Sequence, residues 1–147
     1  MEENMKKFNV LVVDDEQEFR ELTVKRLNKR GLEAKGAESG AEALKKLEHS
    51  KHNDVALLDV KMPGMDGIET LRQIRAQHPL VEVVLLTGHA SVDSGVEGMK
   101  LGAFGYLLKP IELEPHVEKL AEAYEKKRLH EEKIEQAQTK KFMSMPT

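Results

Sequence analysis

Acidic side chains stand where two apolar runs of this chain end. Asp59 follows the run Val55–Leu58. Asp14 and Asp15 follow the run Val10–Val13. Apolar runs of this length are typical of buried strands, so each carboxylate is expected at the carboxyl end of a strand. If the strands are parallel neighbours, the carboxylates meet at one edge of a sheet, which is where open α/β sheets form their sites.

Two further apolar runs end in polar side chains that suit the same chemistry. The run Val83–Leu86 leads into Thr87, and the run Phe104–Leu108 leads into Lys109. Carboxylates held close together either take up protons or bind a cation, and oxygen ligands of this kind suit Mg²⁺. A carboxylate beside such a cation can act as a nucleophile toward a phosphoryl group. The sequence therefore predicts a Mg²⁺-dependent phosphoryl site.

Each of these residues also has an ordinary structural interpretation. Asp15 with Glu18 fits a helix N-cap and its capping-box partner. Thr87 fits an ordinary strand end, and Lys109 alone indicates nothing. The agreement of four strand ends favours the site.

Helical patterns alternate with the apolar runs, and this predicts the fold class. Five βα units in a row indicate an α/β fold, a doubly wound parallel sheet in the strand order 2-1-3-4-5 with helices on both faces. Ser39 and Glu42 form a capping box at the start of one helix. We expect strands over 10–13, 32–37, 55–58, 81–86 and 104–108, and helices over 16–30, from 39, from 68 to about 77, over 90–101, and one burying Leu113, Val117, Leu120 and Tyr124.

The pattern changes after Tyr124. Residues 125–141 are mostly charged and do not continue the apolar stripe. They predict a solvated extension of the last helix that frays toward the C-terminus, and a helix that pairs with its copy in a homodimer, or with a partner, is the alternative. The predicted organisation is an N-terminal tail over 1–7, one domain over 8–125, and this charged helical extension and tail.

Composition excludes several classes of protein. The 147 residues suit one domain, and the net charge of −3 argues against a nucleic-acid surface on this segment. Cysteine is absent, so there is no disulfide framework. Mean hydropathy is −0.52, and no apolar stretch reaches the length of a membrane span. We expect a cytoplasmic protein without a membrane partner.

The motifs together resemble a known family. The stretches are Val12–Glu16, Leu58–Gly67, Leu86–His89 and Tyr106–Pro110. In this order and spacing they resemble the CheY-like receiver domain of two-component response regulators, over about residues 8–125. The resemblance implies a flavodoxin-like fold and a signalling role, with self-phosphorylation and self-dephosphorylation as the only catalysis.

The resemblance also implies roles for the acidic residues. Asp59 would accept a phosphoryl group from a histidine kinase or a phosphotransfer protein. Asp14, Asp15 and Asp59 would hold Mg²⁺, with the backbone carbonyl of Lys61 completing the metal shell.

The remaining motif residues would form a switch. By resemblance, Thr87 and Lys109 contact the phosphoryl oxygens, Tyr106 turns inward as Thr87 shifts, and a cis peptide at Lys109–Pro110 aims the lysine. Glycines at 88, 95, 98, 102 and 105 either mark the mobile segment or permit close packing and turns. Phosphorylation would then alter the face formed by helix four, strand five and helix five.

Two variable positions are expected to tune the phosphate lifetime. Lys61 and His89 lie two residues after Asp59 and Thr87. By resemblance their side chains flank the path of the hydrolytic water. For His89, an ordinary exposed loop residue is the alternative.

Three other functions compete. A haloacid dehalogenase phosphatase would need a general acid where Lys61 stands. A flavin-binding protein would need a phosphate loop where the acidic residues 14–16 stand. A receiver-like module that binds partners without phosphorylation stays open. The output is either a downstream protein target or an effector domain that this segment lacks.

Overall fold

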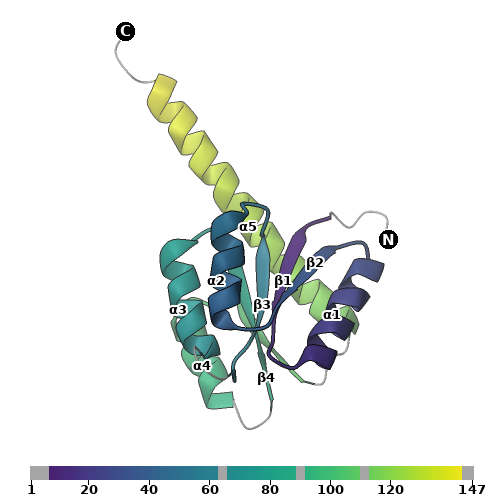
Figure 1. Ribbon diagram of the computed structural model, residues 1–147. Helices are drawn as coiled ribbons and strands as arrows, with labels where there is room; N and C mark the ends of the chain where they lie inside the picture. The colour runs from purple at the N-terminus through teal and green to yellow at the C-terminus, as the bar shows by residue number, and fades with distance from the viewer. Residues whose placement is uncertain (1–6, 63–65, 89–91, 110–112, 144–147) are drawn as a thin grey trace.

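The computed structural model describes residues 7–62, 66–88, 92–109 and 113–143. Within these ranges five strands alternate with five helices along the chain (Figure 1). The strands are β1 (Asn9–Val13), β2 (Glu33–Ala37), β3 (Val55–Asp59), β4 (Glu82–Thr87) and β5 (Gly105–Leu108). The helices are α1 (Gln17–Lys29), α2 (Gly40–His49), α3 (Gly67–Gln77), α4 (Val92–Lys100) and α5 (Leu113–Met143).

The five strands form one parallel sheet in the order β2-β1-β3-β4-β5, which confirms the predicted topology. Every residue of β3 and β4 is buried, as expected for central strands covered on both faces. The edge strands are more polar or more exposed, with Glu33 and Lys35 on β2 and Tyr106 and Leu108 on β5 facing solvent. The most apolar runs of the sequence thus became the centre of the sheet.

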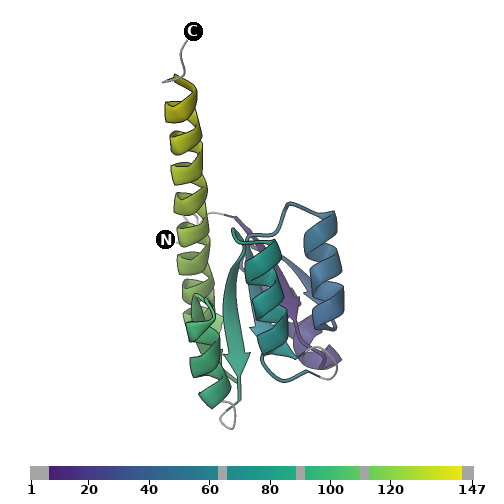
Figure 2. The ribbon, with the colours of Figure 1, turned by 90° about the vertical axis from the view of Figure 1, so that its left-hand side faces the viewer.

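Helices cover both faces of the sheet. One core cluster joins side chains of α2 and α3 to the sheet, including Leu47, Leu71 and Ile74. The other joins α1 and α5 to the opposite face, through Leu27 and Leu120. Figure 2 shows α5 on one side of the sheet and α2 and α3 on the other.

Helix α5 continues far beyond the sheet. Tyr124 stacks on Phe8 with the ring centroids 4.7 Å apart, which fixes the helix beside the start of β1. The helix then continues to Met143, and every residue from Leu129 onward is exposed. Figure 2 shows this second half projecting past the body. The structure thus has a helical extension where one is expected, and its helix ends at Met143, the last described residue.

Glycine lets α4 lie close to the sheet. A Cβ atom on Gly98 would lie 2.1 Å from Leu85 Cδ1, so a larger residue would displace the helix or the leucine. Gly102, with φ +103°, forms the turn after the helix. At these two positions the structure supports the close-packing and turn interpretation of the glycines.

The two predicted helix caps have different outcomes. Ser39 Oγ accepts a hydrogen bond from the Glu42 N–H at 3.1 Å, which confirms that cap. The Asp15–Glu18 cap is wrong: α1 begins at Gln17, its N-cap residue is Glu16, and no side chain caps it. The first turn of α1 therefore leaves the acidic residues before it available to the sheet edge.

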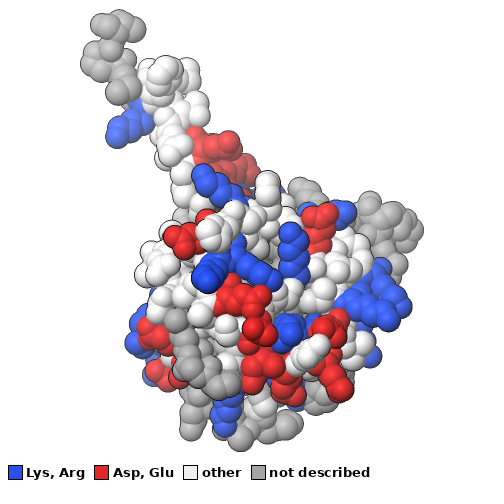
Figure 3. All heavy atoms as spheres, in the orientation of Figure 1, with Lys and Arg blue, Asp and Glu red and all other residues white. Residues whose placement is uncertain are grey.

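In the described part of the chain, none of the helices combines the length and the apolar character that crossing a bilayer requires. Figure 3 shows acidic and basic side chains interspersed over the visible face of the body. No large area of a single charge dominates that face.

Candidate functional site

Three carboxylates meet at the carboxyl edge of the sheet. Asp14 and Asp15 directly follow β1, and Asp59 is the last residue of the neighbouring strand β3. One oxygen from each lies within 4.8 Å of the others. The structure thus brings together the acidic residues that the sequence placed at strand ends.

The backbone fixes two of these carboxylates, which are also the buried ones. Asp14 is 1% exposed and Asp59 is 6% exposed, whereas Asp15 faces solvent. The Glu16 N–H donates to Asp14 Oδ1 at 2.9 Å, and the Lys61 N–H donates to Asp59 Oδ1 at 3.3 Å. Each of these acids therefore has one oxygen held by the chain that follows it and one directed to the cluster.

Gly67 allows the loop after Asp59 to close tightly. A Cβ atom on Gly67 would lie 2.2 Å from the Asp59 carbonyl oxygen, so no other residue fits without moving this backbone. The Gly67 N–H donates to the Val60 carbonyl at 2.9 Å. Asp66 then caps α3, accepting from the Glu69 N–H at 2.9 Å. The Asp66-Gly67 pair therefore helps to hold the end of β3 in place.

Lys109 reaches into the acidic cluster from the end of β5. Its Nζ lies 3.1 Å from Asp14 Oδ2, 3.1 Å from Glu16 Oε1 and 3.7 Å from Asp59 Oδ2. Its backbone N–H donates to the Thr87 carbonyl at 2.8 Å, which ties it to β4. Its ammonium also lies 4.4 Å from the ring centre of Phe19. Glu16 and Phe19 therefore help to position the lysine.

The sequence interpretation missed both of these positioning residues. Glu16 occurred only as part of a motif, and Phe19 was not singled out. Glu16 is the N-cap residue of α1 and Phe19 lies in its first turn, close in sequence to the acidic pair Asp14 and Asp15. This closeness is the signal that could have identified them.

One lysine does not balance this cluster. Burial, followed by the neighbouring charge of Asp14, raises the pKa of Asp59 from 3.8 to about 6. Burial also raises the pKa of Asp14. Burial alone would lower the pKa of Lys109, but its hydrogen bond to Asp14 and the charge of Asp59 outweigh this effect, and its pKa is raised. The site therefore favours added positive charge.

The two predicted switch residues lie at different depths. Thr87 is fully buried at the end of β4, and its hydroxyl has no hydrogen-bond partner among the described residues. Tyr106 on β5 is 40% exposed. The orphaned hydroxyl beside the acidic edge suits a group that gains its acceptor only when a phosphoryl group is present.

Three predicted features stay predictions: the metal contact of the Lys61 carbonyl, the lifetime role of Lys61 and His89, and the cis peptide before Pro110. The Lys61 backbone donates to Asp59, and its side chain is exposed, while the proposed role of its carbonyl stays a prediction. His89 and Pro110 lie outside the described residues, so the lifetime role and the cis peptide stay predictions as well.

The donor set fits Mg²⁺. Three carboxylates with mutually close oxygens, two of them buried and raised in pKa, supply hard oxygen ligands and an excess of negative charge. Asp14, Asp15 and Asp59 are the residues that could hold the ion.

A family model described as "Response regulator receiver domain" matches residues 10–121. The match covers β1 from its second residue, the other four strands, helices α1 to α4 and the start of α5. This is the family that the motifs resemble.

Curated relatives point the same way. The DNA-binding transcriptional regulator NtrC of Escherichia coli (strain K12) is 42% identical over 108 residues, which is 74% of this chain and 23% of that protein. The transcriptional regulatory protein ZraR of Klebsiella oxytoca is 35% identical over 134 residues, 91% of this chain and 30% of that protein. The chain therefore spans about a quarter of the length of the curated relatives it matches.

Solved structures share the fold. A response regulator receiver domain protein from Clostridium thermocellum superposes with a TM-score of 0.74 at 31% identity, covering 86% of this chain and 98% of that one. The receiver domain of NtrX from Brucella abortus gives a TM-score of 0.75 at 30% identity, with 79% and 98% covered. With its sheet order, its acidic edge and these relatives, the chain belongs to the response regulator receiver domain family.

Proposed function

We propose that Asp59 is the phospho-acceptor of this receiver and that the reaction requires Mg²⁺. The observation that carries the proposal is the meeting of three carboxylates within 4.8 Å of one another, with the Lys109 ammonium 3.7 Å from Asp59. A nucleophile, a cation site and a fixed positive charge are the parts that phosphoryl transfer needs.

In the proposed reaction an Asp59 carboxylate oxygen attacks the phosphorus of a phosphohistidine. An O–P bond forms to Asp59, the N–P bond of the donor breaks, and its electron pair returns to the imidazole nitrogen. Lys109 offers its ammonium to a phosphoryl oxygen, and the Thr87 hydroxyl donates a hydrogen bond to another. Bound Mg²⁺, held by Asp14, Asp15 and Asp59, supplies charge neutralisation of the transferring oxygens.

The same residues would convert the phosphate into a conformational signal. An aspartyl phosphate adds charge and acceptor oxygens at the end of β3. The buried Thr87 hydroxyl lacks a partner among the described residues, so a new acceptor would draw it toward Asp59. Tyr106, now 40% exposed on β5, would move into the space that this shift opens. The α4–β5–α5 face is where we expect the change to be recognised.

The partners follow from this chemistry. We propose a histidine kinase or a phosphotransfer protein as the donor, and either a separate target or an attached effector domain as the recipient of the signal. The chain spans only 23% of the length of NtrC, so the proposal for this segment is limited to the receiver. Return to the resting state occurs by self-dephosphorylation, with Lys61 and His89 as the residues expected to set its rate.

Intact mass tests the proposal. The chain is incubated with acetyl phosphate and Mg²⁺, beside Asp59→Asn and the matched control Asp66→Asn, because asparagine caps a helix about as well as aspartate. One added phosphoryl group on the native chain and on Asp66→Asn, none on Asp59→Asn, and none with excess chelator are expected. An added group on Asp59→Asn equal to that on the native chain would refute the assignment.

A further inference from the structure

The amino ends of β3 and β4 carry a second set of charged side chains, which are buried or partly buried. Asp54 directly precedes β3, and Glu82 is the first residue of β4, paired in register with Val55. The Glu82 side chain is 1% exposed and that of Asp54 is 13% exposed. These carboxylates lie at the opposite ends of the strands from Asp59 and Thr87.

Asp54 is held through both oxygens. Its Oδ1 lies 2.7 Å from Lys127 Nζ of α5, and its Oδ2 accepts from the Asn9 N–H at 2.8 Å. The Lys127 side chain is only 10% exposed, and its Nζ also lies 3.2 Å from Glu131, one turn further along α5. Lys127 therefore joins the helix to the start of β3 by a nearly buried ion pair.

Glu82 depends on cations from two helices. Lys126 Nζ of α5 lies 3.5 Å from Oε1, and the Arg75 guanidinium of α3 lies 4.0 Å from Oε2. Neither oxygen accepts a hydrogen bond from the described residues. Arg75 is itself held by the Pro79 and Val81 carbonyls at 3.0 and 3.1 Å. The more mobile of the two cations is thus Lys126, since its side chain is 53% exposed.

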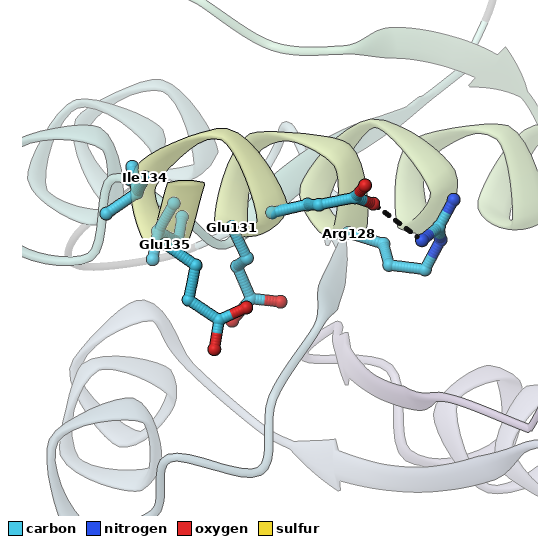
Figure 4. Close-up of a pocket in the computed structure, with 6 residues that line it drawn as sticks. Arg128, Glu131, Ile134 and Glu135 are labelled. Carbon is cyan, nitrogen blue, oxygen red and sulfur yellow. Dashed lines mark hydrogen bonds and ion pairs between the residues drawn. The ribbon is translucent and has the colours of Figure 1, made fainter. Parts of the chain in front are cut away.

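Lys126 and Lys127 lie near the end of the part of α5 that packs on the body, and each forms an ion pair at the start of a strand. The apolar anchors end at Ala123 and Tyr124, and the residues from Leu129 onward are exposed. Beyond the lysines, only an open notch separates the helix from the turn before β4, lined by Leu80 and by Arg128, Glu131, Glu132, Ile134 and Glu135 of the helix. Figure 4 shows Glu131 and Glu135 pointing from the helix into this open space.

We propose that Lys126 and Lys127 form a clasp, two adjacent helical residues that hold the beginnings of two adjacent strands, and that this clasp fixes the direction in which residues 128–143 leave the body. Two points of attachment on different strands restrict both the tilt and the roll of the helix, which a single pair cannot do. Ion pairs of Arg128 with Glu125 and Glu132 then support the projecting helix itself.

The clasp fixes the orientation of the projecting helix relative to β3 and β4, the strands that end in Asp59 and Thr87. β3 has Asp54 before it and Asp59 at its end, and β4 runs from Glu82 to Thr87. Whatever follows or binds residues 128–143 is therefore presented at a set angle to the phosphorylation site. This inference does not rest on the proposed function, because the clasp acts whether or not Asp59 is phosphorylated.

Spin-label distances test the clasp. The chain contains no cysteine, so Glu48→Cys on α2 and Gln138→Cys on the projecting helix provide two unique labelling sites, both exposed. The distance distribution is measured by pulsed electron paramagnetic resonance in this background, then in Lys127→Met and Lys126→Met. Lys133→Met, which removes an exposed lysine from the same helix, is the matched control.

The expected result is a narrow distribution in the parent and in Lys133→Met, and about a doubling of its width in each clasp variant. A distribution as narrow as the control in either folded clasp variant would overturn the proposal. If Lys127→Met does not fold, Lys126→Met decides, because its lysine is the more exposed. Phosphorylation by acetyl phosphate is measured on the same samples, so a failure of the clasp and a failure of the Asp59 assignment give different patterns.

Discussion

The sheet carries acidic side chains at both ends of its strands, and the cations that lie near them differ between the two ends. At the amino ends Asp54 and Glu82 each have a lysine of α5, and Glu82 has Arg75 as well. At the carboxyl edge, where β1 and β3 end, Asp14 and Asp59 share one lysine, Lys109, which Glu16 also engages, and Asp15 completes the acidic cluster. The same sheet therefore holds a compensated set of charges at one edge and an uncompensated set at the other.

The difference separates structural charges from functional ones. A buried charge with its partner stabilises a particular arrangement, and removing the partner is costly. Burial, followed by the neighbouring charge of Asp14, destabilises the ionised form of Asp59 and raises its pKa, and the single lysine does not offset this. Such a cluster gains from binding a cation, as the proposed function of this site requires.

The amino edge, where β3 and β4 begin, should lose more stability than the carboxyl edge when one charge is removed. Lys127→Met leaves the Asp54 carboxylate without its cation in a nearly buried position, and we expect the free energy of unfolding to fall by about 3 kcal/mol. Urea unfolding measures this, with Lys133→Met as control. A loss no greater than that of the control would show that Lys127 does not stabilise the edge.

At the carboxyl edge, where β1 and β3 end, removing one charge should instead stabilise the fold. The folded state raises the pKa of Asp59 from 3.8 to about 6, so the protonated acid stabilises the fold fully below about pH 4, and this stabilisation is lost as the pH rises through about 6. Without metal, Asp59→Asn should therefore be more stable than the native chain by about 2 kcal/mol near neutral pH. The difference should shrink as the pH falls toward 4.

Urea unfolding in the presence of a chelator, from about pH 8 down to about pH 5, measures this difference. An Asp59→Asn variant that is less stable than the native chain at neutral pH would contradict the account.

Mg²⁺ should offset part of the excess negative charge of Asp14, Asp15 and Asp59, and so stabilise the fold. At ten times its dissociation constant a ligand that binds only the folded state adds about 1.4 kcal/mol. We expect a shift of this size in the native chain and a much smaller one in Asp15→Asn, which removes an exposed ligand without disturbing the core. Thermal unfolding with and without Mg²⁺ provides the test, and equal shifts in both proteins would place the ion elsewhere.

Thr87 should show the smallest effect on stability. Its buried hydroxyl lacks a partner in the described structure, so Thr87→Val is expected to change the free energy of unfolding by less than about 1 kcal/mol, or to raise it. The equally buried Thr70, whose hydroxyl donates to the Asp66 carbonyl at 2.8 Å, is the control, and Thr70→Val should cost about 1 kcal/mol. A larger loss at Thr87 than at Thr70 would indicate a hydrogen bond at the resting site.

Much of the fold could be predicted because its signals are local. Apolar runs such as Val83–Leu86 have a length typical of strands, and alternation with helices leaves few topologies open. The acidic cluster could be predicted for a related reason, since parallel strands bring their carboxyl ends to one edge. Asp15 was harder to interpret locally, because a helix cap and a site ligand require the same residue type.

The amino edge could not be predicted in this way. Asp54 and Glu82 look like ordinary polar residues before apolar runs, and Lys126-Lys127 reads as part of a charged stretch. Their pairing depends on how α5 crosses the ends of β3 and β4, over a separation of 73 residues in the case of Asp54 and Lys127. No local pattern encodes that crossing.

The most direct measurement is to locate the phosphoryl group in the chain. The protein is treated with acetyl phosphate and Mg²⁺, the acyl phosphate is reduced with borohydride to a stable alcohol, and tandem mass spectrometry of the peptides finds the altered residue. We expect the change at Asp59 and at no other carboxylate, with Asp54 and Glu82 at the opposite ends of the strands unmodified. Modification of Asp14, Asp15 or Asp54 with Asp59 intact would contradict it.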